Sequence, residues 1–170
     1  MKFWAGLVIG ILALPVLAFL CVYFGYVPIA TAAPPFPFER RMASMALKAR
    51  IARSKPMQPG VPANEENLMA GARLYREYCA MCHGVPSQPK TPIALGMYPP
   101  PPQLFQGHGV TDDPVSDTYW KVTDGIRLTG MPAFIALSDT ERWQISQMLA
   151  TADKLPTAVS AYLAQAPAAK

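Results

Sequence analysis

The most informative segment of this chain is Cys79-Ala80-Met81-Cys82-His83. Two cysteines separated by two residues and followed at once by a histidine form the attachment signal for c-type haem. Each cysteine can form a thioether with one vinyl group of the porphyrin, and the adjacent histidine can bind the iron. The spacing therefore predicts one covalently attached haem c, with Cys79 and Cys82 as thioether donors and His83 as an iron ligand.

Three other interpretations of this segment are weaker. Structural zinc needs four protein ligands, and outside the segment the chain has only one further cysteine, Cys21, and one further histidine, His108. A thioredoxin-like pair of cysteines accompanies a βαβ pattern, and the sequence contains no convincing strand. A disulfide would leave His83 unexplained. With only three cysteines in 170 residues, the chain is also unlike disulfide-rich secreted scaffolds.

A second axial ligand is needed if the iron is to transfer electrons. Met131 is the expected ligand, because it follows His83 by 48 residues and the chain can cross the haem over that distance. Met97, only 14 residues after His83, and His108 are the alternatives, and so is an open sixth position. Iron is the metal that this site predicts.

The segments around these residues predict an all-α fold. Helices are expected from residue 64, where Asn64 is a good N-cap, to 78, and over 116–124. A capping box, Ser138 with Glu141, opens another helix. A proline-rich loop from 84 to 114 is expected to wrap around something other than protein, since loops of that length are unusual in a small domain.

Together, the Cys-x-x-Cys-His segment, the proline-rich loop, the stretch 125–134 and the tryptophan-bearing helix after it resemble a class I mono-haem cytochrome c domain over residues 64–151. The resemblance implies a small helical domain around a covalent haem, with its first and last helices crossing at Gly71. It also implies that a proline carbonyl, of Pro101 or Pro102, accepts a hydrogen bond from the proximal histidine. Arg127 resembles a residue that pairs with a haem propionate.

The N-terminal segment predicts a membrane anchor. Residues 3–27 carry no charge, and 25 residues of helix span about 37 Å, which exceeds a hydrocarbon core of about 30 Å. A cleaved signal peptide is the competing interpretation, because Ala30-Thr31-Ala32 resembles a cleavage site, but signal-peptide apolar regions run to only about 15 residues. We expect residues 1–30 to be an uncleaved transmembrane anchor.

Charge is divided unevenly along the chain. Residues 1–55 hold seven basic residues and one acid, whereas residues 56–170 hold eight basic and ten acidic residues. The basic cluster lies beside the apolar segment, which favours a membrane over a nucleic acid as its partner. We expect residues 31–63 to form a proline-rich spacer and a basic juxtamembrane helix over 38–54, and residues 152–170 to form a tail with a short helix.

These features predict a membrane-anchored electron-transfer protein and not an enzyme. The haem domain is expected in the bacterial periplasm, because covalent haem attachment occurs outside the cytoplasmic membrane, and Phe134 and Tyr98 are expected to keep water from the iron. Redox proteins in or on that membrane are the expected partners. The alternatives are a permanently bound haem subunit of a larger respiratory or dehydrogenase complex, and a haem enzyme or gas sensor with an open sixth site.

Overall fold

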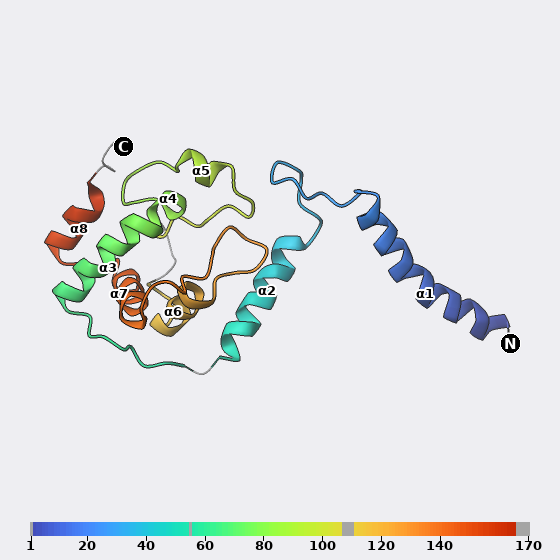
Figure 1. The fold of residues 1–170 in the computed structure, drawn as a ribbon, viewed down its shortest axis with the longest axis horizontal. Helices are drawn as coiled ribbons and strands as arrows, with labels where there is room; N and C mark the ends of the chain where they lie inside the picture. Colours follow the sequence, from blue (N-terminus) through green and yellow to red (C-terminus); the bar gives the residue numbers. More distant parts are fainter. Residues whose placement is uncertain (1, 55, 107–110, 166–170) are drawn as a thin grey trace. The chain divides into compact units, whose positions relative to one another are not determined.

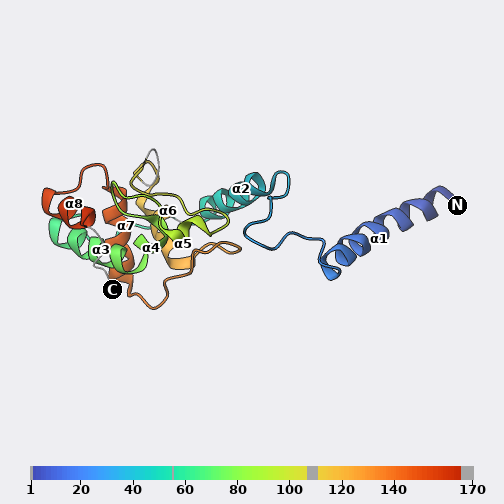
Figure 2. The same ribbon diagram turned by 90° about the horizontal axis from the view of Figure 1, so that it is seen from above.

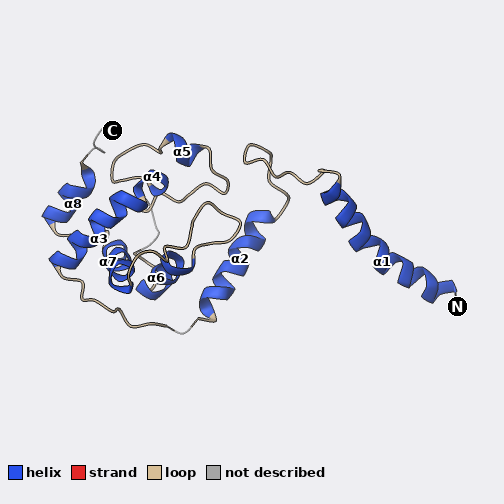
Figure 3. Cartoon of the chain, in the orientation of Figure 1, coloured by secondary structure: helices blue, strands red, loops and turns tan. Residues whose placement is uncertain are grey.

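The computed structural model describes residues 2–54, 56–106 and 111–165. These residues form helices joined by loops, with no strand among them (Figure 3), so the all-α prediction is confirmed. The chain divides into two units, residues 1–39 and residues 40–170. The helices are α1 (Lys2–Tyr23), α2 (Glu39–Ala52), α3 (Glu65–Tyr78), α4 (Ala80–His83), α5 (Pro92–Leu95), α6 (Val115–Asp124), α7 (Asp139–Ala150) and α8 (Thr157–Ala164).

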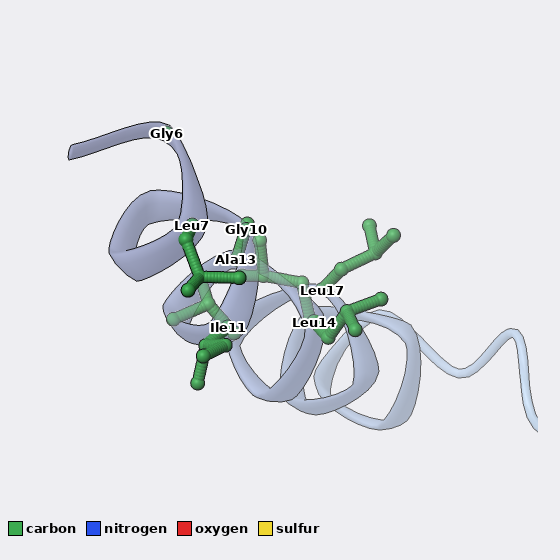
Figure 4. A pocket seen from close by; sticks show the side chains of 9 residues that line it. Gly6, Leu7, Gly10, Ile11, Ala13, Leu14 and Leu17 are labelled. Carbon is green, nitrogen blue, oxygen red and sulfur yellow. The ribbon is translucent and has the colours of Figure 1, made fainter. Parts of the chain in front are cut away.

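The first unit consists of α1 and the segment that follows it. The window Gly6–Tyr23 has a mean hydropathy of 2.5, so α1 is long and apolar enough to cross a membrane, and by length and composition a signal sequence would look the same. The helix runs through Pro15 and ends at Tyr23, before Gly25 with its φ of 74°. Figure 4 shows a shallow hollow along one side of α1, where the small residues Gly6 and Gly10 leave space between leucines.

The crossing of α3 and α7 organises the second unit (Figure 1). Helix α3 begins where the Asn64 side chain accepts a hydrogen bond from the backbone N–H of Asn67 at 2.9 Å. Gly71 lies at the crossing: a Cβ there would overlap the backbone carbonyl of Gln144 on α7. The predicted close approach at Gly71 is therefore confirmed, since only a residue without a side chain lets the two backbones come this near.

Helix α7 begins with the predicted capping box. The Ser138 hydroxyl accepts from the N–H of Glu141, and the Glu141 carboxylate accepts from the N–H of Ser138 at 2.7 Å. The helix then buries half of its side chains, and it packs against both α3 and α6. The fully buried large side chains of the unit are Tyr75, Ile145, Met148, Val159 and Leu163.

Helix α8 is part of this core, whereas the sequence analysis placed residues 152–170 outside the domain. Val159 and Leu163 are completely buried. Helix α8 packs against α3, and both views show the two helices side by side (Figures 1 and 2). Arg76 of α3 fastens the helix by donating to the carbonyl oxygens of Tyr162, at 2.6 Å, and Gln165, at 3.0 Å. A short apolar helix after a proline gives little sign in the sequence of where it packs.

Helix α2 occupies nearly the expected range. Its Leu47 and Ile51 are half-buried and line a groove with Trp120 of α6, and the Arg50 guanidinium lies 5.7 Å from the centre of the Trp120 ring. Met42 and Met45 face solvent. The basic helix expected as a juxtamembrane linker is therefore in contact with α6.

Candidate haem-binding site

Helices α3 and α4 meet at Cys79, which ends the first helix and precedes the second. The Cys79 carbonyl accepts hydrogen bonds from the N–H groups of Cys82, at 3.1 Å, and His83, at 2.9 Å. This turn of helix places residues 79 and 82 on one face, because side chains three apart are neighbours. Both cysteines are free thiols, so the structure holds two unpaired sulfurs one turn apart, followed directly by an imidazole.

The two thiols differ in their surroundings. Cys79 is buried, and this burial raises the pKa of its thiol to about 12, with a further contribution from Cys82. Burial also raises the pKa of Tyr75, as does the nearby Cys79. The Tyr75 hydroxyl donates to the carbonyl oxygen of Gly84 at 2.7 Å, and this bond ties α3 to the chain just after His83.

The orientation of His83 is set by a backbone carbonyl. Its Nδ1 lies 2.8 Å from the carbonyl oxygen of Pro102, and since a carbonyl only accepts, Nδ1 carries the proton. Burial lowers the pKa of His83, while the bond to Pro102 acts in the opposite direction. A neutral ring with its Nδ1 bound in this way offers Nε2 to a metal ion. Of the two prolines expected here, Pro102 makes this contact, and Pro101 is buried beside it.

Further side chains hold the loop after α4 in place, and the sequence analysis did not identify them. The Gln103 side chain donates to the carbonyl oxygen of Cys82 at 3.4 Å and covers Gly84, which has a φ of 73°. The Thr91 hydroxyl donates to the carbonyl oxygen of Met81 at 2.5 Å. Thr91 precedes Pro92, an arrangement typical of a helix start, and this signal could have located α5 within the proline-rich loop.

Met131 lies in a loop that is closed by hydrogen bonds between its own residues. Its carbonyl accepts from the N–H of Ile126 at 3.1 Å, and its N–H donates to the Thr129 hydroxyl at 3.1 Å. Gly125, with a φ of 66°, lets the two ends of the loop approach so closely that a Cβ would meet the N of Ala133. Met131 is half-buried and packs against the apolar cluster that includes Cys79.

The other residues considered from the sequence have different surroundings. Met97 is half-buried and touches Gly130, next to Met131. His108 lies outside the described residues. Arg127 is exposed and makes no hydrogen bond or ion pair with the described part of the chain, which leaves its guanidinium available to a bound group.

Aromatic side chains surround the same region. Phe105 packs edge-on against Tyr75 with ring centres 5.2 Å apart, and Phe134 packs edge-on against Tyr78 at 6.3 Å. Phe105 and Phe134 also contact the core cluster that contains Cys79. Tyr98, expected to help exclude water, is half-buried. These rings give the region beside Cys79 a largely apolar lining.

The donors present here suit haem c better than a metal ion held by protein alone. No group of three or more His, Cys, Asp and Glu side chains among the described residues is arranged to hold a metal ion. Two free thiols one turn apart, one oriented imidazole and one thioether in an apolar setting correspond to the attachment and axial ligation of a haem. The residues therefore fit this cofactor.

Residues 66–148 match the family model described as "Cytochrome C oxidase, cbb3-type, subunit III". No curated protein is significantly similar to the chain. The match extends from the first turn of α3 to the last turn of α7, and so covers every residue of the site described above.

Proposed function

Residues 66–148 form a c-type cytochrome domain that carries covalent haem c, and on this basis we propose that the chain is a membrane-anchored periplasmic carrier of single electrons. When bound, the haem supplies an iron that alternates between its ferrous and ferric states. The observation that carries the proposal is His83, whose Nδ1 is bound to Pro102, whose Nε2 makes no hydrogen bond with the described residues, and which directly follows two unpaired thiols one turn apart.

Each residue of the site has one task in this proposal. Cys79 and Cys82 hold the porphyrin through thioethers, and His83 binds the iron from one side. The Pro102 carbonyl fixes the ring plane of His83 and, by accepting its Nδ1 proton, makes the other nitrogen a better ligand. Arg127, with its guanidinium uncommitted among the described residues, pairs with a propionate.

Met131 is the second axial ligand in this proposal. Its loop is stiffened by the bonds from Ile126 and Thr129, so the sulfur need not be ordered again at each electron transfer. A thioether opposite an imidazole raises the reduction potential. Phe105 and Phe134 exclude water from this region. A sixth position filled by Met131 would suit electron transfer and would disfavour a haem enzyme or gas sensor.

The anchor and the site of action follow from α1. Haem becomes covalently attached outside the cytoplasmic membrane, so the domain belongs in the periplasm and α1 in the inner membrane, with its N-terminus facing the cytoplasm. Tethering concentrates the domain near membrane-bound redox partners. A start near Ala33 in the intact mass of the mature protein would contradict the anchor, whereas retention in the membrane fraction after high-salt washing is expected.

A second candidate function is a fixed subunit of a larger oxidoreductase complex. The matched family model carries the name of an oxidase subunit, and this favours it. Gentle purification from membranes distinguishes the two. A mobile carrier is expected to purify alone, whereas a stoichiometric partner that withstands high salt would identify a subunit.

The axial ligand has its own experiment. Ferric protein with Met131 on the iron is expected to show a weak far-red absorption band, and Met131→Ala should lose it while retaining covalent haem. Met45→Ala, at an exposed position on α2, is the control and should retain the band. A band that survives in Met131→Ala would assign the ligand to another residue.

A further inference from the structure

Met97 makes a contact that neither the haem-attachment motif nor the proposed ligand set explains. A Cβ built on Gly130 would meet, among the described residues, only the side chain of Met97 within 4 Å. The Met97 methyl group occupies the space of that missing Cβ, and its sulfur lies 3.7 Å from it. Two segments far apart in sequence, the loop after α5 and the Met131 loop, thus meet at this point (Figure 1).

Met97 is linked to α4, the helix that carries Cys82 and His83. The Thr91 hydroxyl donates to the carbonyl of Met81, which lies between the two cysteines, and accepts from the N–H of Ala94 at 3.1 Å. Ala94 is buried, and its carbonyl oxygen lies 3.5 Å from the N–H of Met97. The main chain from 91 to 97 therefore forms a short hydrogen-bonded link that starts at α4 and ends at the Met97 side chain.

The other partner in this contact is also rigid. The bond between Ile126 and Met131, with those of Thr129, closes the loop on itself, and the N–H of Phe134 donates to the carbonyl of Val122 at 3.0 Å. Such a loop moves as one body about its ends. Gly130 is exposed and next to Met131, so a contact there acts almost directly on the position of the proposed ligand.

We propose that Met97 is a positioning residue that holds the Met131 loop in place through the contact of its methyl group with Gly130, so that Met131 would stay bound to the haem iron. The inference rests on the proposed function, in which Met131 binds the iron. We call this contact between Met97 and Gly130 the brace. Removing it raises the fraction of molecules in which the Met131 loop is open and the sixth position is accessible. An external ligand then binds more tightly in proportion to that fraction.

The brace depends on shape and not on the sulfur. An unbranched methionine reaches across the gap between the two segments and fills it. Leucine is apolar and of similar volume, so it should fill most of this gap, although its side chain ends one atom short of the Met97 methyl position. The backbone of Gly130 is not in the left-handed region. Among the described residues, only the Met97 side chain lies within 4 Å of the Cβ that an alanine would add there.

The test uses the ferric full-length protein in detergent and measures the dissociation constant of imidazole, together with the far-red band. Met97→Ala should tighten imidazole binding about 10-fold, a roughly tenfold rise in the open fraction. Met97→Leu should remain within about twofold of the wild type, and so should the control Met45→Ala. Unchanged imidazole binding in Met97→Ala would overturn the inference. Loss of the band in Met97→Leu would also overturn it, because Met97 would then be a ligand.

Gly130→Ala tests the same contact from the other side. Alone, it should tighten imidazole binding by less than Met97→Ala does, because the overlapping atom is the flexible end of the Met97 side chain and can move aside. Combined with Met97→Ala, the new methyl group has room, so the double variant should bind imidazole no more tightly than Met97→Ala alone. If the effects of the two substitutions on the free energy of imidazole binding simply added, a shared contact would be refuted. Since Gly130 is exposed, this arm stays informative if Met97→Ala does not fold.

Met131→Ala distinguishes a failure of the brace from a failure of the proposed iron ligand. Loss of the far-red band in Met131→Ala, with wild-type behaviour of Met97→Ala, would reject the brace and leave the proposed ligand in place. Retention of the band in Met131→Ala would reject the proposed ligand itself.

Discussion

Gly71→Ala should weaken the crossing on which the haem-binding unit is built. A Cβ at position 71 would lie 2.6 Å from the carbonyl carbon of Gln144 and 3.0 Å from the Cβ of Met148. The first of these atoms belongs to the backbone of α7, so no side-chain rotation can relieve the overlap. The two helices must instead move apart, and the buried side chains around them must repack.

The magnitude follows from two opposing effects. Overpacking of a core costs about 1–3 kcal/mol, and contact with backbone places this case near the upper end. Alanine in a helix interior is favoured over glycine by about 1 kcal/mol. The net loss in the free energy of unfolding is therefore about 2 kcal/mol, which lowers the urea midpoint by about 1 M.

Urea denaturation of the full-length holoprotein in detergent, followed by circular dichroism and haem absorbance, measures this loss. Gly96→Ala is the matched control, because a Cβ there meets nothing closer than 3.7 Å, and its stability should change by less than about 0.5 kcal/mol. If Gly71→Ala were as stable as the wild type, the close crossing of α3 and α7 would be wrong.

Three further predictions follow from the same structure. Leu163→Ala should lower the free energy of unfolding by about 2–5 kcal/mol because the Leu163 side chain is completely buried under α3. If Leu163→Ala lost less stability in the same urea assay than Leu95→Ala, at an exposed position, α8 would not be part of the core. Hydrogen bonds from Ser138 lower the pKa of Glu141 below its ordinary 4.5, so the stabilisation from the Glu141 carboxylate is complete above pH 4.5 and disappears as the pH falls through the lowered pKa. Glu141→Gln should reduce this loss of stability at acid pH in pH-dependent unfolding, and an unchanged profile would refute the role of the capping box. Met81→Glu, exposed between the two cysteines, should slow electron transfer to the native partner in stopped-flow measurements more than Lys154→Ala, and equal effects would place docking on another face.

The local features of this fold were accessible from the sequence, because they depend on residues close together in the chain. Asn64 and the pair Ser138 and Glu141 start their helices as predicted, since a cap bonds to a backbone group three residues away. The Cys-x-x-Cys-His spacing identified the site for a similar reason. Gly71 was identified only through the family resemblance, which supplies a partner helix that the residue itself does not reveal.

The contacts that were missed join segments far apart in the chain. The sequence could not distinguish Pro101 from Pro102, because the choice depends on which carbonyl the folded loop turns toward His83. The packing of α8 and the contact between Met97 and Gly130 likewise depend on tertiary approach, which hydrophobic spacing within one segment does not encode.

The central claim is that His83 and Met131 close both axial positions of a covalent haem and make this chain an electron carrier. Exposing the ferrous full-length protein to carbon monoxide, with absorbance recorded before and after, tests it most directly. The account predicts an unchanged spectrum, because the Met131 loop keeps the sixth position filled. Stoichiometric formation of a carbon monoxide complex would contradict it and would indicate an open site suited to catalysis or gas sensing.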